Sequence, residues 1–270
     1  MTTLQVIILG IIQGLTEFLP ISSSAHLVLL PYLLKWNFPP VALDAALHFG
    51  TFLALLVYFF PEVLKILRGF FLSFQPSRKP SSEEKFYLRL SWWIIIGTIP
   101  IVIIALLFKN QVESSFKSAL ITSVFLLLTG VLLAFADTFS YPTKPMASLN
   151  PLKAFFIGIF QAFAVFPGIS RSGATISGGL IFGLRREEAA RFSFLLSLPA
   201  VIGATVLEIP SLNWEGLVLG QFLIGIGVST LVGILCIHYF LKFLRRSRLI
   251  WFAIYCWLFG LFALLKIFVF

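Results

Sequence analysis

Long apolar runs separated by short polar gaps dominate this chain. A helix needs about 20 mostly apolar residues to cross a bilayer. The runs that meet this length cover residues 44–60, 90–108, 117–138, 191–209, 217–241 and 250–269. We expect these six segments to form transmembrane helices.

Two further apolar stretches, 4–35 and 152–184, are each interrupted by a polar break. The breaks are Glu17–His26, which contains a proline and three serines, and Pro167–Gly173, which contains two glycines and an arginine. Each break leaves arms of about 10–14 residues, which are too short to span a bilayer. The pattern therefore predicts two re-entrant helical hairpins.

The two hairpins resemble each other in sequence. When Gly10–Ala25 is set against Gly158–Gly173 without a gap, seven of sixteen positions are identical, including one glutamine and two serines. The next span in each half opens with an acidic residue followed by Ala-Ala, at Asp44 and at Glu188. We interpret residues 1–140 and 150–270 as two repeats within a single membrane domain, 1–270.

An odd number of spans in each repeat inverts the second half relative to the first. The predicted fold is therefore an all-α polytopic membrane protein with six transmembrane helices and two re-entrant helical hairpins in an inverted-topology repeat. In such folds, broken helices build a site at the interface between the repeats. The plan supports a site near the bilayer midplane, but by itself it does not separate transport from catalysis.

Composition supports the membrane class. The chain is 59% apolar and 11% charged, with a mean hydropathy of +1.00, whereas soluble domains carry about 25% charged residues. The net charge of +9 could suggest nucleic acid. However, the basic residues lie in the gaps between apolar runs, as topology determinants do, so we expect lipid and no nucleic acid as partner.

The distribution of Lys and Arg predicts the orientation. Fifteen of the twenty lie in the segments 61–89, 144–153, 185–191 and 242–248, all on one side if both hairpins are re-entrant. Lysines and arginines favour the cytoplasmic side. Both termini are then expected outside the cytoplasm, and four lysines share that side: Lys35, Lys109, Lys117 and Lys266.

The first break carries several reactive side chains. Glu17 is an intramembrane carboxylate, which is costly and tends to pair or to line a cavity. It is either a structural ion-pair partner or a metal ligand or general acid/base, and Gln13 lies one helical turn before it. The serines Ser22, Ser23 and Ser24 either cap the next half-helix or supply a nucleophile that His26 activates.

The second break has the features of an anion site. Gly168 and Gly173 allow close backbone approach, and the following half-helix presents free N–H groups. Arg171 adds a charged fork that suits phosphate oxygens, unless it serves to pair with Glu17. Hydroxyl donors follow at Ser170, Ser172 and Thr175. We interpret His48 and His238 as packing or hydrogen-bonding residues within the spans, while Asp44 is a weaker candidate for facing the site.

These two breaks resemble known motifs. The segments 13–26 and 167–177 are similar to the two signature motifs of the bacterial undecaprenyl-diphosphate phosphatase (bacitracin-resistance) family, and the resemblance extends over the whole chain in length and spacing. It implies an enzyme of the bacterial plasma membrane that opens to the outer face. Such an enzyme would hydrolyse undecaprenyl diphosphate to the monophosphate and would depend on a divalent cation, Mg²⁺ or Ca²⁺.

The resemblance also implies residue roles. The acidic motif falls on Gln13 and Glu17 as metal ligands, although many family members carry a second glutamate in place of Gln13. The Ser/His cluster falls on Ser22, Ser23 and His26, and Ser24-Ala25 stands where other members have Thr-Gly. The phosphate loop falls on Ser170, Arg171, Ser172 and Thr175, with Gly168 and Gly173 in its backbone.

The residues and the resemblance together give a mechanism with two branches. Either Ser23, assisted by His26, attacks the terminal phosphorus, or a water molecule activated by His26 or the metal does so. Glu17, Ser23, His26 and Arg171 are the expected catalytic residues, and a polyprenyl diphosphate is the expected substrate. A homodimer is compatible with this plan. The alternative function is a transporter or flippase of polyprenyl phosphates.

Overall fold

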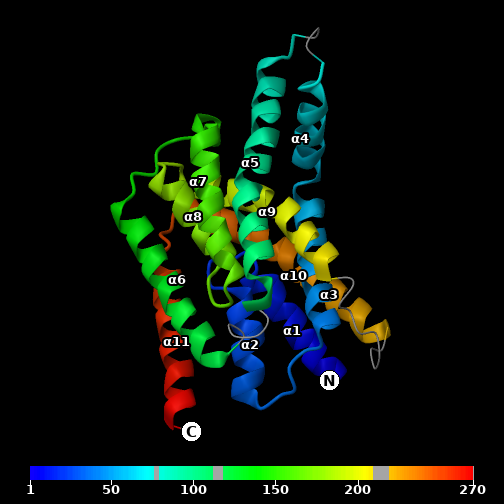
Figure 1. Cartoon of the computed structure of the whole chain (residues 1–270), viewed down its shortest axis with the longest axis vertical. Helices are drawn as coiled ribbons and strands as arrows, with labels where there is room; N and C mark the ends of the chain where they lie inside the picture. Colours follow the sequence, from blue (N-terminus) through cyan, green and yellow to red (C-terminus); the bar gives the residue numbers. More distant parts are fainter. Residues whose placement is uncertain (76–78, 112–117, 209–218, 270) are drawn as a thin grey trace.

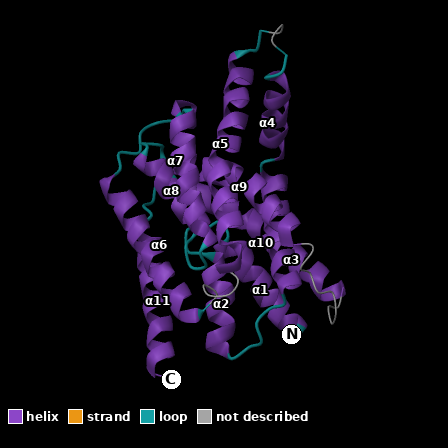
Figure 2. Cartoon of the chain, viewed as in Figure 1, coloured by secondary structure: helices purple, strands orange, loops and turns teal. Residues whose placement is uncertain are grey.

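A computed structural model of the chain describes residues 1–75, 79–111, 118–208 and 219–269. These ranges are helical apart from their connections and one isolated β-bridge, Lys144–Leu184 (Figure 2). The α-helices are α1 (Thr3–Thr16), α2 (Ser23–Leu34), α3 (Val41–Tyr58), α4 (Phe60–Leu72), α5 (Ser82–Gln111), α6 (Ala119–Phe139), α7 (Pro151–Ala162), α8 (Arg171–Ile181), α9 (Arg186–Glu208), α10 (Leu219–Leu244) and α11 (Ile250–Val269). Two short 3₁₀ turns are η2 (Met146–Ser148) and η3 (Phe163–Val165).

The predicted all-α membrane class is confirmed. Among the described residues, five helices are long and apolar enough to cross a membrane, namely α3, α5, α6, α10 and α11. The remaining predicted span, 191–209, falls within α9, whose first turn carries Arg186, Glu187 and Glu188. Position 209 of that span, 117 of the third span and 217–218 of the fifth lie outside the described residues.

The polar segment 61–89 is more ordered than its sequence suggests. It contains most of α4 and the first turns of α5. The charged face of α4 forms the ion pairs Lys65–Glu83 and Arg68–Glu84 with α5. Gly69 lies against the backbone at Tyr87, where a β-carbon would have no room. Together these contacts hold α4 and α5 side by side.

Both predicted breaks interrupt helices. Helix α1 ends at Thr16 and α2 begins at Ser23, while the second connection joins α7, η3 and α8. Figure 1 shows the α1–α2 pair starting and ending near the end of the molecule that holds both termini. The α7–α8 pair enters from the opposite end, and the turns of the two pairs lie near the middle.

Small residues let the hairpins pack closely against long helices. Helix α1 packs on α10, and α7 packs on α5. A β-carbon at Gly14 would lie 2.8 Å from the side chain of Val232, and one at Gly158 would collide with the backbone of Gly97. Close backbone approach of this kind is typical of helix packing in membranes.

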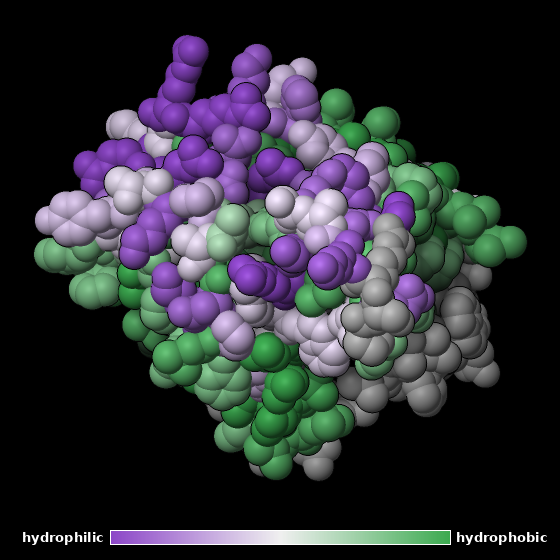
Figure 3. All heavy atoms as spheres, turned by 90° about the horizontal axis from the view of Figure 1, so that it is seen from above, coloured by the Kyte–Doolittle hydropathy of each residue, from purple (hydrophilic) through white to green (hydrophobic). Residues whose placement is uncertain are grey.

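Charged residues collect at one end of the molecule. Figure 3 views the structure from the end where α4 and the start of α5 project, and hydrophilic side chains gather over part of that face. At the end of α6, Asp137 is buried and accepts hydrogen bonds from Arg186 and Arg248, at 2.7 Å and 3.0 Å for the nearest nitrogen of each. Asp137 therefore ties α6 to the start of α9 and to the α10–α11 connection.

Candidate functional site

The first break positions its side chains through a strained turn. Ser22 has a φ of +67°, a left-handed value that is uncommon for a residue other than glycine. Its hydroxyl accepts a hydrogen bond from the Ala25 N–H at 3.2 Å and caps α2. Glu17, at the end of α1, and Ser23, at the start of α2, are thereby brought to the same side of the turn.

Glu17 is the centre of the polar contacts at this turn. Its side chain is 6% exposed. Oε2 accepts hydrogen bonds from the Ser23 hydroxyl at 2.7 Å and from the Gln13 amide at 3.0 Å. Oε1 accepts one from Arg171 Nη2 at 2.7 Å. A buried carboxylate needs such partners because desolvation of an unpaired charge is costly.

The second break requires glycine at its turn. Gly168 has a φ of +103°, and a β-carbon there would collide with the carbonyl of Thr122. Ser170 then caps α8, because its hydroxyl accepts a hydrogen bond from the Gly173 N–H at 3.0 Å. This turn places Arg171 in the first turn of α8, beside the free N–H groups of that helix.

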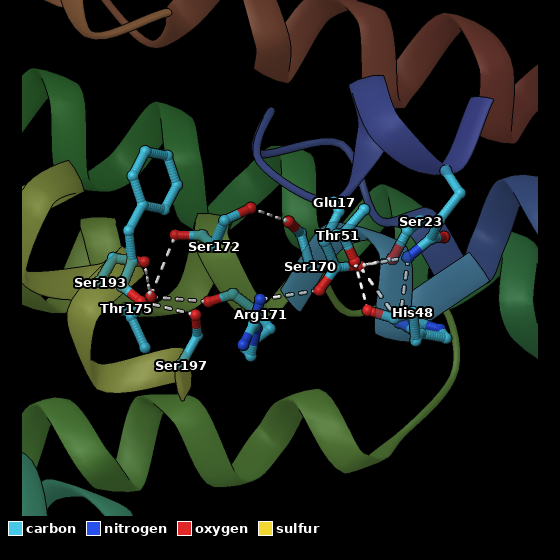
Figure 4. A network of polar contacts seen from close by, with 12 residues as sticks. Glu17, Ser23, His48, Thr51, Ser170, Arg171, Ser172, Thr175, Ser193 and Ser197 are labelled. Carbon is cyan, nitrogen blue, oxygen red and sulfur yellow. Dashed lines mark hydrogen bonds and ion pairs between the residues drawn. The ribbon is translucent and has the colours of Figure 1, made fainter. Parts of the chain in front are cut away.

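The two breaks touch each other. The Gly168 N–H donates to the Ser24 hydroxyl at 3.2 Å, and the Ser172 hydroxyl donates to the Leu19 carbonyl at 3.0 Å. Arg171 and Glu17 complete the junction (Figure 4). The sequence left open that Arg171 pairs with Glu17, and this ion pair is present.

Arg171 uses only part of its hydrogen-bonding capacity. Nη2 donates to Glu17, whereas Nη1 is buried and has no hydrogen-bond partner. A buried unpaired donor is costly. A fork with one arm unpaired next to the N-terminus of a helix is suited to receive an anionic oxygen.

Several predicted substrate contacts instead support the turn. The hydroxyls of Ser170 and Ser172 lie 3.1 Å apart. Thr175 Oγ1 donates to the Arg171 carbonyl at 2.8 Å and lies 2.5 Å from the hydroxyl of Ser193. Figure 4 shows Thr175 and Ser193 on the side of Arg171 away from Glu17, whereas Ser170 lies on the Glu17 side. Their contacts fix the backbone that carries Arg171.

His26 does not reach Ser23. One ring nitrogen lies 2.8 Å from the Ser22 carbonyl and the other lies 2.7 Å from the Tyr255 hydroxyl. The imidazole stacks on Phe259 and lines an apolar cavity of about 660 Å³ between α1, α2 and the α10–α11 region. The expected Ser–His pair is therefore not formed, because α2 turns the imidazole toward α11.

The two breaks are closely packed where they meet. The Glu17 side chain is only 6% exposed. The side chain of Arg171 is 15% exposed, and the ion pair fills the space between the hairpins. A diphosphate would have to part this contact to bind.

The sequence predicted a packing or hydrogen-bonding role for His48 but did not place it beside Glu17. Its Nδ1 lies 3.0 Å from Gln13 Nε2 and 3.6 Å from Glu17 Oε2. Asp44, one turn earlier on α3, lies 4.0 Å from the other ring nitrogen. The spacing of Asp44 and His48 was the available signal, because residues four apart share one face of a helix.

Comparison with known proteins places the chain in a family. The family model described as "Bacitracin resistance protein BacA" matches residues 6–262. The chain belongs to this family. It is 43% identical over 257 residues to the undecaprenyl-diphosphatase of Caldicellulosiruptor bescii, covering 94% of both chains. It is 42% identical to the undecaprenyl-diphosphatase of Geotalea daltonii over 262 residues, covering 94% of this chain and 95% of that one.

A third relative covers slightly more of the BacA-family chain. The undecaprenyl-diphosphatase of Chloroherpeton thalassium is 42% identical over 275 residues, which cover 98% of this chain and 96% of the relative. The matched region contains both breaks. The resemblance seen in the two motifs is thus confirmed as family membership.

Proposed function

We propose that this protein is a membrane phosphatase that hydrolyses undecaprenyl diphosphate to undecaprenyl phosphate and inorganic phosphate. Relatives that align with this chain over almost their full length are named undecaprenyl-diphosphatase. The observation that carries the proposal is the meeting of Glu17, Ser23 and Arg171 at the two breaks. The transport alternative finds no support in the family or in the named relatives.

Arg171 is assigned to the diphosphate. Phosphoryl transfer depends mostly on positioning and on electrostatic stabilisation of the phosphoryl oxygens. The unpaired Nη1 and the N-terminus of α8 supply donors for these oxygens. The diphosphate would take the place of the Glu17 carboxylate on the guanidinium, which frees Glu17 for proton transfer.

Ser23 is assigned as the nucleophile, with Glu17 in place of His26 as its base. The Ser23 Oγ would attack the terminal phosphorus, its proton would pass to the Glu17 carboxylate, and the anhydride P–O bond would break to release undecaprenyl phosphate. Water would then cleave the phosphoserine and release inorganic phosphate. The second branch is direct attack by a water molecule, with Glu17 in place of His26 as its base. The 2.7 Å contact between Ser23 and Glu17 favours the first.

A divalent cation is assigned to Glu17 and Gln13. The Glu17 carboxylate suits such an ion, and the Gln13 Oε1 is buried without a hydrogen-bond partner, so it is free to act as a ligand after rotation of the amide. When bound, Mg²⁺ or Ca²⁺ would offset the charge of the diphosphate. The protein groups would still bind, orient and deprotonate as described above.

The membrane arrangement completes the proposal. We assign six spans, counting α9 with the five apolar helices, and two re-entrant hairpins, α1–α2 and α7–α8. The termini and the opening of the site are placed on the outer side of a bacterial plasma membrane, by the Lys and Arg distribution. The expected homodimer stays a prediction.

Release of phosphate from a purified sample tests the activity. The wild type in detergent, supplied with undecaprenyl diphosphate and Mg²⁺ or Ca²⁺, should release one phosphate per lipid and leave the monophosphate. Glu17→Gln should reduce the rate by about 100-fold or more, because it removes the proposed base. Arg245→Ala, which changes an ion pair with Glu187 outside the site, is the control and should keep the wild-type rate. Absence of phosphate release by the wild type would overturn the proposal.

A further inference from the structure

His48 lies at the edge of the proposed site with one nitrogen directed into it. Its Nδ1 is 3.0 Å from the Gln13 amide nitrogen and 3.6 Å from Glu17 Oε2. The His48 side chain is 30% exposed, whereas that of Glu17 is 6% exposed. Figure 4 shows His48 and Glu17 together on the same side of Arg171.

We propose that His48 is the third protein ligand of a divalent metal ion bound by Glu17 and Gln13. This inference rests on the proposed function, since it completes the ligand set of that site. Ligands of one metal ion at about 2.1 Å lie about 3 to 3.5 Å from one another. The separations of the Glu17, Gln13 and His48 atoms, 3.0 Å to 3.6 Å, fall close to this range.

Gln13 is the residue that makes the ligand set complete. Within the described part of the chain, no three His, Cys, Asp or Glu side chains converge on one point. The Gln13 side chain is fully buried, and its Oε1 has no partner while Nε2 faces Glu17 and His48. A half-turn of the amide exchanges the two atoms and directs the unpaired oxygen at the same point.

Asp44 supplies the outer partner that a histidine ligand usually has. A metal-bound histidine commonly directs its second N–H to a carboxylate, which fixes its tautomer and orientation. Asp44 Oδ1 lies 4.0 Å from His48 Nε2 and has no hydrogen-bond partner of its own. Asp44 is therefore a positioning residue for His48 and does not touch the metal.

A nitrogen ligand changes which metal the site favours. Mg²⁺ and Ca²⁺ prefer oxygen ligands, whereas imidazole suits transition metals better. A set of one carboxylate, one amide oxygen and one imidazole should bind Mn²⁺ more tightly than Ca²⁺. This preference should depend on His48.

Pulsed electron paramagnetic resonance on the Mn²⁺-loaded full-length protein tests the inference. The wild type should show coupling between Mn²⁺ and an imidazole nitrogen. His48→Ala and His48→Gln should lose this coupling and bind Mn²⁺ at least about tenfold more weakly, and Asp44→Asn should bind it about tenfold more weakly. His238→Ala is the matched control, because His238 contacts Tyr58 outside the site, and it should keep both signals.

Two results would overturn the inference: a wild type without nitrogen coupling, or a His48→Gln variant with coupling and Mn²⁺ affinity unchanged. If neither His48 variant folds, loss of the coupling in His238→Ala or in His26→Ala would overturn it, and retention in both would support it. Phosphate release by the same wild-type sample separates the two claims. Hydrolysis without nitrogen coupling removes His48 from the metal and leaves the proposed function. Nitrogen coupling without hydrolysis keeps His48 as a metal ligand and removes the proposed function.

Discussion

At the residue scale, Arg171 has one terminal nitrogen on Glu17 and the other buried without a partner. The same ion pair could serve stability, catalysis or both. Removing one partner of a buried pair leaves an unpaired charge and costs about 3–5 kcal/mol. Substitutions at this pair must therefore be judged by folding and by turnover together.

Arg171→Lys separates the two roles. Lysine keeps the positive charge near Glu17 but loses the planar fork that binds two phosphate oxygens. We expect the melting temperature to stay near that of the wild type and the rate of phosphate release to fall by about 100-fold. Thermal unfolding and phosphate release measured on the same sample check this. A variant with the wild-type rate would remove the guanidinium from substrate binding.

Ser23→Ala tests the nucleophile. Loss of the hydroxyl removes the group that contacts Glu17 at 2.7 Å, and the rate should fall by about 100-fold or more. Rapid quenching with substrate labelled at the terminal phosphate should trap a phosphoserine on the wild type and none on the variant. Ser73→Ala, outside the site, is the control. If no phosphoserine forms on the wild type, the water branch is correct.

At the element scale, close contacts between glycines and backbones hold the hairpins against long helices. Gly158 on α7 faces the backbone of Gly97 on α5, whereas Gly227 on α10 has open space around the position of a β-carbon. Alanine favours a helix over glycine at both positions by about 1 kcal/mol. Only at Gly158 would the added methyl group clash with its surroundings, so Gly227 serves as the matched control position.

Gly158→Ala should lower the stability of the protein, while Gly227→Ala should not. Overpacking typically costs about 1–3 kcal/mol, and at Gly158 the obstacle is backbone that cannot rotate away. Thermal unfolding in detergent measures both variants. Equal melting temperatures would show that α7 and α5 are not in close contact.

Asp137 joins three helical segments at the charged end. Its buried carboxylate binds Arg186 and Arg248 and accepts a hydrogen bond from the Ile250 N–H at 3.2 Å. Asp137→Asn should destabilise the protein by about 3 kcal/mol, because the two arginines lose their common charge. Glu83→Gln, which alters the exposed pair with Lys65, should leave the melting temperature almost unchanged. Equal effects of the two variants would contradict the assigned role of Asp137.

At the scale of the whole molecule, the packing of helices follows the proposed repeat. The first helix of the hairpin in each half packs on a long helix of the other half: α1 packs on α10, and α7 packs on α5. Helices α3 and α9 also contact each other, as do α6 and α11. If each helix is replaced by its counterpart in the other half (α1 by α7, α3 by α9, α5 by α10 and α6 by α11), the same four pairs result. This symmetry supports an inverted repeat in which α4 is an addition to the first half.

Labelling of single cysteines tests the orientation. Asn37 and Thr143 are exposed. The Lys and Arg distribution predicts that Asn37 lies outside the cytoplasm and Thr143 on the cytoplasmic side. Asn37→Cys should react with a membrane-impermeant maleimide in intact cells, whereas Thr143→Cys should react only after permeabilisation. The native Cys236 and Cys256 are buried and provide the unlabelled background. The reverse labelling pattern would invert the proposed topology.

The sequence predicted the junction better than the details of the site. Glu17 and Arg171 each interrupt a long apolar stretch of the sequence, where a charge is expected to need a partner, so their meeting followed from their positions. The orientation of His26 did not, because it depends on Tyr255, which lies 229 residues away. The place of His48 beside Glu17 was not predicted, because a single histidine in an apolar span gives almost no signal of its own. Helix α4 was missed because it is short, and its pairing with α5 depends on ion pairs between separate segments of the chain.

The most direct test is a double-mutant cycle on the ion pair between the hairpins. Phosphate release would be measured for Glu17→Gln, Arg171→Gln and the double variant, with thermal unfolding in parallel. The double variant buries no unpaired charge, so it should fold at least as well as either single variant. Residues that act as a unit give non-additive losses. The double variant should therefore be no more than about tenfold slower than the slower single variant. Two results would contradict a shared catalytic role of Glu17 and Arg171. One is a double variant whose fold-loss in rate equals the product of the two single losses, and the other is a double variant near the wild-type rate.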